Sequence, residues 1–330
     1  MSFGDVSYLL GRAHGIIGNV LTKSQLSLLL SSKNLKELRA AFTQTQYNSV
    51  IGSLNFETQL EDVARKLKID FAEMLVKFYN QTSSSVQKKI RLFSERYNAE
   101  NLRIILQGIH VGMKQEDIIA RIVPVADYTL EYYTKLLLMP LTKIISTQMD
   151  SKLQKELLKA YEEFETTGRF TPIESTIDQY IYATLPKVSR KYETYVNMKN
   201  ILALSRCITL GIPAYRYMLP NKFIAKALKA HNVSEVLAMY NYQPYKAVFS
   251  KYIGQEDVPL HELEFAVERY LLKYWKKTFR YGTVFETDSL IGFFELKLAE
   301  VMDVIRIIVG VSAGFTESEI RENLLFYGIF

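Results

Sequence analysis

Three helical segments of this chain share one pattern, and they lie roughly a third of the chain apart. Each has Asn or Asp at its fifth residue and is mostly apolar after it; the segments are Tyr97–Gly108, Val196–Arg206 and Ala299–Gly310. A repeat of about one hundred residues is far longer than the few-dozen-residue repeats of common solenoids. The pattern therefore predicts three diverged helical subdomains rather than a tandem array.

A segment with glutamate at its second residue precedes each of these, at Leu60–Leu67, Ile173–Tyr180 and Leu263–Tyr270. A third element is clear only twice, at Asn34–Tyr47 and Asn232–Tyr245, and the middle third has no convincing copy. The order of the segments predicts pseudo-threefold symmetry. We expect subdomains at residues 1–114, 115–213 and 214–330.

Composition points to the same fold class. The chain has only 15 glycines and 8 prolines in 330 residues, well below the usual share of about 12%, so it has little turn chemistry for an all-β fold. We expect an all-α protein. Hydroxyl or amide caps followed three residues later by Glu or Gln predict helix starts at Asn34, Ser151, Thr171, Asn232 and Thr316.

One cysteine, Cys207, in an apolar helical stretch excludes a disulfide framework and a multi-cysteine metal site. We expect it to be a core thiol in a reducing compartment. The start of the chain has no basic-then-apolar leader, so we expect no secretory signal. No apolar stretch approaches the roughly 20 residues that a membrane-spanning helix needs.

Catalytic signatures are mostly absent. Gly310-Val-Ser312-Ala-Gly314 matches the G-x-S-x-G pattern of a hydrolase nucleophile, but that pattern needs a strand before the serine. Here it follows a helical stripe, and the glycines favour a helix end. The four histidines show no metal-ligand spacing, and no phosphate-binding glycine loop is present. We expect no catalytic, cofactor-binding or metal-binding residue.

Charged residues leave two alternatives open. The chain has 41 basic and 35 acidic residues, and its densest basic stretch, Lys273–Tyr281, mixes cations with aromatics as nucleic-acid surfaces do. It also fits a helix that buries Leu271, Leu272 and Trp275, which we favour. Similarly, Glu61, Glu174 and Glu264 can form one threefold polar cluster, or each can pair locally with a helix cap or a basic neighbour within its own subdomain, which we also favour.

The repeated Glu and Asn/Asp helices, the stretch Leu38–Tyr47 and the ending at Glu295–Gly310 and Gly314–Arg321 together resemble the C subunit of the A/V-type rotary ATPases, which is named the d subunit in the vacuolar enzyme. The similarity spans essentially the whole chain. Its motifs are diffuse helical patterns. Asp303 departs from the family, which more usually has Asn there.

This resemblance implies a funnel-shaped, non-catalytic protein of three helical subdomains, present in a single copy within a hetero-oligomeric complex. It would lie on the cytoplasmic face of a prokaryotic membrane as a peripheral protein. Its partners would be the D and F subunits of the central stalk and the proteolipid ring, with no nucleic acid, cofactor or small-molecule substrate. It would transmit torque for proton or sodium transport.

Six residues are candidates for cavity or subdomain-junction contacts with partners: the repeated polar positions and the arginines near them, namely Asn101, Arg103, Asn200, Arg206, Asp303 and Arg306. The alternative function is a free-standing helical scaffold that binds protein or nucleic acid. Binding to nucleic acid would weaken steeply with salt through counterion release. Docking of a stalk would keep a salt-resistant apolar component.

Overall fold

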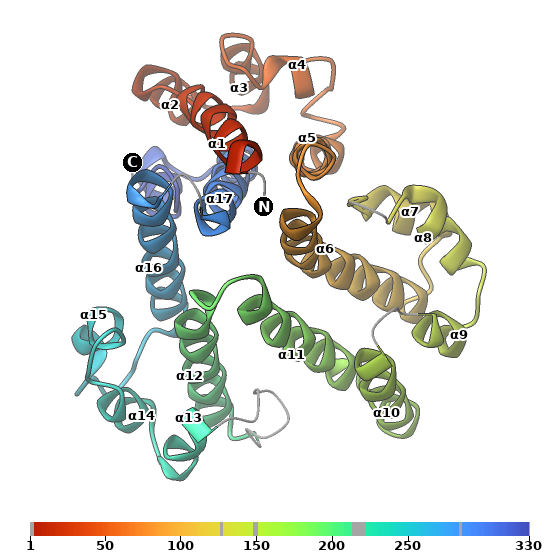
Figure 1. The fold of residues 1–330 in the computed structure, drawn as a ribbon, viewed down its shortest axis with the longest axis vertical. Helices are drawn as coiled ribbons and strands as arrows, with labels where there is room; N and C mark the ends of the chain where they lie inside the picture. Colours follow the sequence, from red (N-terminus) through yellow and green to blue (C-terminus); the bar gives the residue numbers. More distant parts are fainter. Residues whose placement is uncertain (1–2, 126–127, 148–150, 213–221, 284–285, 330) are drawn as a thin grey trace. The chain divides into compact units, whose positions relative to one another are not determined.

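The computed structural model describes residues 3–125, 128–147, 151–212, 222–283 and 286–329, and these ranges are built from helices (Figure 1). Extended backbone pairs in them only at an isolated antiparallel bridge between Val125 and Tyr128. The expectation of an all-α fold is confirmed. The pseudo-threefold arrangement, the funnel shape and the three subdomain boundaries stay predictions.

Long helices form the framework of the chain: α1 (Phe3–Gly18), α5 (Leu60–Tyr79), α6 (Ser84–His110), α10 (Ser151–Thr167), α11 (Thr171–Val188), α12 (Tyr192–Leu210), α16 (Leu260–Tyr281) and α17 (Thr287–Ser312). Shorter helices connect them: α2 (Lys23–Leu30), α3 (Leu35–Phe42), α4 (Asn48–Ile51), α7 (Gln115–Arg121), α8 (Leu130–Leu137), α9 (Leu141–Ser146), α13 (Lys222–Ala225), α14 (Val233–Met239), α15 (Lys246–Phe249), α18 (Glu317–Glu322) and the 3-10 turns η2 (Ala227–Lys229) and η3 (Ser250–Tyr252).

The repeat in the sequence is a repeat of long helix pairs. The glutamate segments lie on α5, α11 and α16, and the Asn/Asp segments lie on the helices that follow them, α6, α12 and α17. Each pair is joined by a short connection. The sequence pattern therefore identified every pair in its correct order.

The three Asn/Asp helices also end alike. Eleven residues after each Asn or Asp stands a glycine with left-handed backbone: Gly112 (φ 72°), Gly211 (φ 64°) and Gly314 (φ 75°). The next backbone N–H bonds back to the carbonyl five residues earlier, at 2.9 Å each, in the pairs Met113 to Gly108, Ile212 to Cys207 and Phe315 to Gly310. This is the Schellman helix end. The G-x-S-x-G match is thus the end of α17, as expected from its glycines.

These ends allow a matched stability test. We expect Gly211→Ala to lower the free energy of unfolding by about 1 kcal/mol, because a Cβ disfavours the left-handed conformation. The control is Gly15→Ala, an exposed position in α1 where a Cβ would meet nothing within 4 Å. That change should raise the free energy by about 0.5–1 kcal/mol. Urea unfolding followed by circular dichroism measures the free energy of unfolding of each variant. The same change in both variants would contradict the left-handed helix end at Gly211.

Side-chain caps begin three of the five expected helices; Ser151 is the first residue of α10, and the three residues before it lie outside the described ranges. Asn34, Asn232 and Thr316 accept hydrogen bonds from the backbone N–H three residues later, at Glu37, Glu235 and Glu319. The expectation at Thr171 is wrong, because Thr171 is the first residue of α11 and the preceding Phe170 offers no capping side chain. Proline at the second position, Pro172, presets the backbone there instead.

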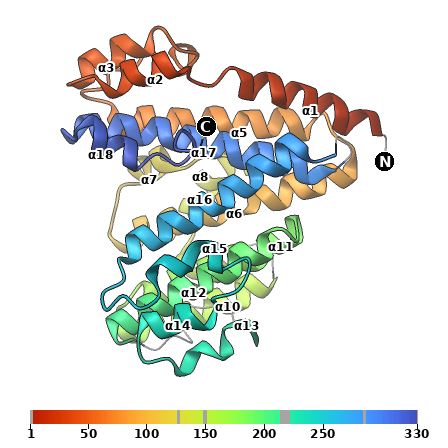
Figure 2. The ribbon, with the colours of Figure 1, turned by 90° about the vertical axis from the view of Figure 1, so that its left-hand side faces the viewer.

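The chain separates into two compact units. Unit 1 comprises Met1–Arg91, Ala120–Leu130 and Leu272–Phe330. Its centre is α17, which contacts α1, α2, α3, α5 and α18 and is buried along most of its length (Figure 2). The short helices α2 and α3 therefore pack on the last long helix of the chain.

Unit 2 comprises Leu92–Ile119 and Glu131–Leu271. Within it α11 contacts both α10 and α12, and α12 contacts α13 and α14 (Figure 1). One apolar core joins α12, α14, α15 and the first turns of α16, with Ile201, Val236, Phe249, Leu263 and Val267 each fully buried. This core fixes one face of α12, while a part of its surface toward α11 remains open to solvent.

Candidate functional site

The three repeated polar residues are buried inside the chain. Asn101, Asn200 and Asp303 are 2%, 3% and 0% exposed. In unit 2 the Asn101 amide donates to the hydroxyl of Tyr133 at 2.9 Å, and that hydroxyl donates to Asn98 at 2.9 Å. Burial raises the pKa of Tyr133, so it stays a neutral donor. These bonds fasten α8 to α6.

A second repeated position lies three residues earlier on the same helices, at Asn98, Asn197 and Glu300. Each is hydrogen-bonded to the hydroxyl of a tyrosine from a later part of the chain. The pairs are Asn98 with Tyr133, Asn197 with Tyr245 at 3.0 Å, and Glu300 with Tyr327 at 3.1 Å. The sequence analysis missed this position. The signal was present, because the spacing of polar residue, two others and polar residue occurs in all three segments.

In unit 1 Asp303 holds the end of the chain. Its carboxylate accepts the backbone N–H of Leu325 at 2.9 Å and of Tyr327 at 3.0 Å, and the guanidinium of Arg306 at 2.7 Å. Burial raises the pKa of Asp303, while these three donors oppose that shift. The carboxylate therefore fastens the C-terminal segment onto α17.

A buried ion pair lies beside it. Lys297 and Glu300, on the same side of α17, are bonded to each other, with side chains 8% and 0% exposed. The ammonium of Lys297 also donates to the hydroxyl of Tyr47 at 3.2 Å. Burial raises the pKa of Tyr47, and the charge of Glu300 adds to this shift. The pair links the segment after α3 with α17.

The three candidate arginines are more exposed than the buried Asn and Asp residues. Arg103 pairs with Asp178 and lies 3.4 Å from Glu100, and Arg206 pairs with Glu264. Both pairs join an Asn helix to the Glu helix of the following repeat, α6 to α11 and α12 to α16. Arg306 instead pairs within α17. Contact with partner proteins stays a prediction for all six candidates.

Lys199 adds a second cation to the contact between α12 and α16. Its ammonium lies 3.4 Å from Glu264 and is also bonded to Glu268, which accepts from the Tyr195 hydroxyl at 3.0 Å. Burial lowers the pKa of Lys199, but the two carboxylates outweigh that effect and raise it overall. Glu264 therefore pairs with cations of the preceding repeat and not, as expected, within its own subdomain. The carboxylate of Glu61 lies 4.0 Å from Arg121, which is also outside the expected subdomain of residues 1–114.

An open groove runs between α11 and α12 in unit 2, with a volume of about 440 Å³. We call it the α11–α12 groove. It brings together one candidate residue, two of the repeated glutamates and several apolar side chains, and its lining is Thr171, Glu174, Ser175, Asp178, Tyr182, Lys199, Leu202, Ala203, Arg206, Cys207, Leu210, Ile212 and Glu264. Cys207 is buried there, as expected for a core thiol, and burial raises its pKa.

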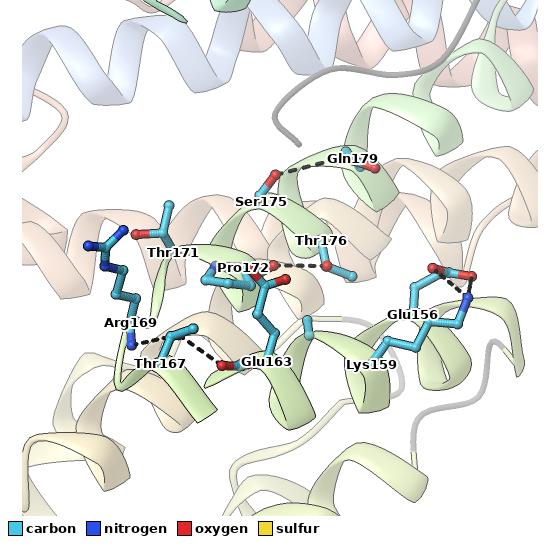
Figure 3. Close-up of a pocket in the computed structure, with 11 residues that line it drawn as sticks. Glu156, Lys159, Glu163, Thr167, Arg169, Thr171, Pro172, Ser175, Thr176 and Gln179 are labelled. Carbon is cyan, nitrogen blue, oxygen red and sulfur yellow. Dashed lines mark hydrogen bonds and ion pairs between the residues drawn. The ribbon is translucent and has the colours of Figure 1, made fainter. Parts of the chain in front are cut away.

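A second hollow of about 350 Å³ lies on the other side of α11, against α10 (Figure 3). Its polar groups are occupied by one another. Glu156 pairs with Lys159 at 3.1 Å, the Thr176 hydroxyl donates to Pro172 at 2.9 Å, and Gln179 donates to Ser175 at 3.4 Å. Arg169 extends at the opposite end from Glu156 (Figure 3). The hollow thus offers few polar groups that are not already bonded locally.

Other features of the described residues are structural. The basic stretch buries Leu271, Leu272 and Trp275, and the ammonium of Lys276 donates to the Ile329 carbonyl at 2.6 Å, so the favoured amphipathic interpretation is confirmed.

The described ranges hold no cluster of three or more possible metal ligands. Among the helices described, none has the length and apolar character to cross a membrane.

Comparison with known proteins gives consistent results. The family model described as ATP synthase (C/AC39) subunit matches residues 9–323. The chain is 19% identical to the C subunit of the A-type ATP synthase of Methanocaldococcus jannaschii, over 97% of this chain and 86% of that protein. It is 22% identical to the C subunit of the A-type ATP synthase of Halorubrum lacusprofundi, over 85% of each.

The match reaches from α1 to the end of α18 and so includes all three helix pairs with their common helix ends. The resemblance inferred from the repeated segments is confirmed. The chain belongs to the ATP synthase (C/AC39) subunit family.

Proposed function

We propose that this protein is the non-catalytic rotor-coupling subunit of an A/V-type ATPase or ATP synthase. In this proposal it links the central stalk, formed by the D and F subunits, to the proteolipid ring of the membrane. It transmits torque between them and so takes part in proton or sodium transport. It acts as a single copy, bound peripherally on the cytoplasmic face, in a funnel of three similar subdomains.

The observation that carries this proposal is the family match, which spans residues 9–323 and is accompanied by two relatives that are C subunits of A-type ATP synthases. The structure supports it with features that a mechanical part needs. Successive repeats are fastened together by Arg103 with Asp178 and by Arg206 with Glu264. A buried polar network also ties the C-terminal segment to α17. Such links resist shear between helices.

The test is calorimetric titration of the purified protein with a reconstituted D–F pair at low and high salt. We expect saturable one-to-one binding that survives high salt, because an interface with an apolar centre is only partly electrostatic. Absence of binding by a folded, helical protein would reject the proposal. Binding to nucleic acid that falls steeply with salt would favour the scaffold alternative.

A further inference from the structure

We propose that the α11–α12 groove is the docking site for a cationic, amphipathic helical segment of the central stalk. This inference rests on the proposed function and adds to it the surface and the chemistry of the contact. Three properties of the groove carry it: its length, its charge balance and its exposed apolar end.

The groove has the dimensions of a helix-binding surface. Its lining residues follow one face of α11 from Thr171 to Tyr182 and one face of α12 from Lys199 to Leu210. The rise of 1.5 Å per residue makes each of these walls about 16 Å long, or three helical turns. Two antiparallel walls of this length form the kind of channel into which a partner helix can lay one face.

The charge of the groove is complementary to a cation. Its two basic groups, Lys199 and Arg206, are both neutralised by Glu264, and Glu268 also binds Lys199. Asp178 is paired with Arg103. Glu174, which is half-buried in the first turn of α11, has no ion-pair partner among the described residues. The local excess is therefore negative and is centred on Glu174.

The apolar side chains gather near Glu174, at the same end of the channel. Leu210 is 67% exposed and Ile212 is 38% exposed, and both line the groove beside the start of α11. A partner helix with a Lys or Arg opposite Glu174 and a large apolar residue about one turn away would satisfy both features. Contacts of this kind combine electrostatic selection with an apolar anchor.

Two variants of the full-length protein test the proposal by calorimetry against the D–F pair. We expect Glu174→Lys to weaken binding about tenfold at low salt, with a smaller effect at high salt. We expect Leu210→Asp to weaken it about tenfold at both salt concentrations. The matched controls are Glu162→Lys and Leu158→Asp on α10, which are exposed positions outside the groove and should leave affinity unchanged.

The binding results distinguish a failure of the groove as docking site from a failure of the rotor-coupling function. Wild-type binding that both groove variants retain in full would overturn the groove assignment and leave the proposed function standing. Absence of wild-type binding would reject both. Equal losses in the α10 controls would show a diffuse contact and overturn the assignment. A loss confined to binding of the isolated proteolipid ring would overturn it as well, because the occupant would then be the ring. Circular dichroism confirms that each variant is folded.

Discussion

Replacing Lys297 with methionine should destabilise the protein by about 3–5 kcal/mol. The substitution keeps the aliphatic stem but removes the cation that neutralises Glu300, whose side chain is fully buried. Breaking one partner of a buried ion pair costs this much because the other charge is left in a medium of low polarity. It also removes the bond to Tyr47. Urea unfolding at neutral pH measures the effect.

The double variant Lys297→Met with Glu300→Gln separates this cause from lost packing. Glutamine can still accept the hydroxyl of Tyr327, which bonds Glu300 at 3.1 Å in the native protein, but it brings no buried charge. We expect the double variant to recover most of the stability that the single variant loses. A double variant as unstable as Lys297→Met would show that the uncompensated charge is not the cause.

The second large effect is expected at Asp303. Asp303→Leu should lower the free energy of unfolding by about 3 kcal/mol, because two backbone N–H groups, of Leu325 and Tyr327, lose a buried acceptor. Asp303→Asn should cost only about 1–2 kcal/mol, since the amide retains one acceptor oxygen. Hydrogen exchange of the Leu325 and Tyr327 amides should accelerate most in the leucine variant.

A control for Asp303 is available on the same helix. Arg306→Gln removes the partly exposed guanidinium that bonds Asp303 but leaves both backbone acceptor bonds in place. We expect it to cost less than Asp303→Leu, because the two backbone N–H groups still stabilise the buried carboxylate. If Arg306→Gln matched Asp303→Leu, the ion pair rather than the fastening of the C-terminal segment would explain the stability.

Local signals made much of this fold predictable. The Asn caps at Asn34 and Asn232 and the left-handed glycine of α17 act within a few residues, so their sequence patterns determine the helix boundaries directly. The order of Glu helix and Asn/Asp helix was likewise visible, because it recurs three times. The cap expected at Thr171 failed since proline at the next position already suits the first turn of a helix, and the chain enters α11 one residue earlier.

The long-range contacts were not predictable in the same way. Arg103 meets Asp178 across 75 residues, and nothing near either residue specifies the other. The contact of Tyr133 with Asn101 depends on how α8 packs on α6, which the sequence did not indicate because the middle third has no convincing copy of the third element. The groove also escaped prediction, because a groove is a property of two helix faces and not of any segment.

The common helix ends have a consequence for how this chain can change in evolution. A left-handed glycine stops each Asn/Asp helix at the same point, so residues added after it do not shift the residues before it. Among the described residues, the connection from Gly112 to α11 holds α7, α8, α9 and α10, whereas the connection from Gly211 to α16 holds α13, η2, α14, α15 and η3. Loop closure costs only about 0.6 kcal/mol for each doubling of length. Insertions at these three points can therefore diversify the protein while the lengths of its long helices stay constant.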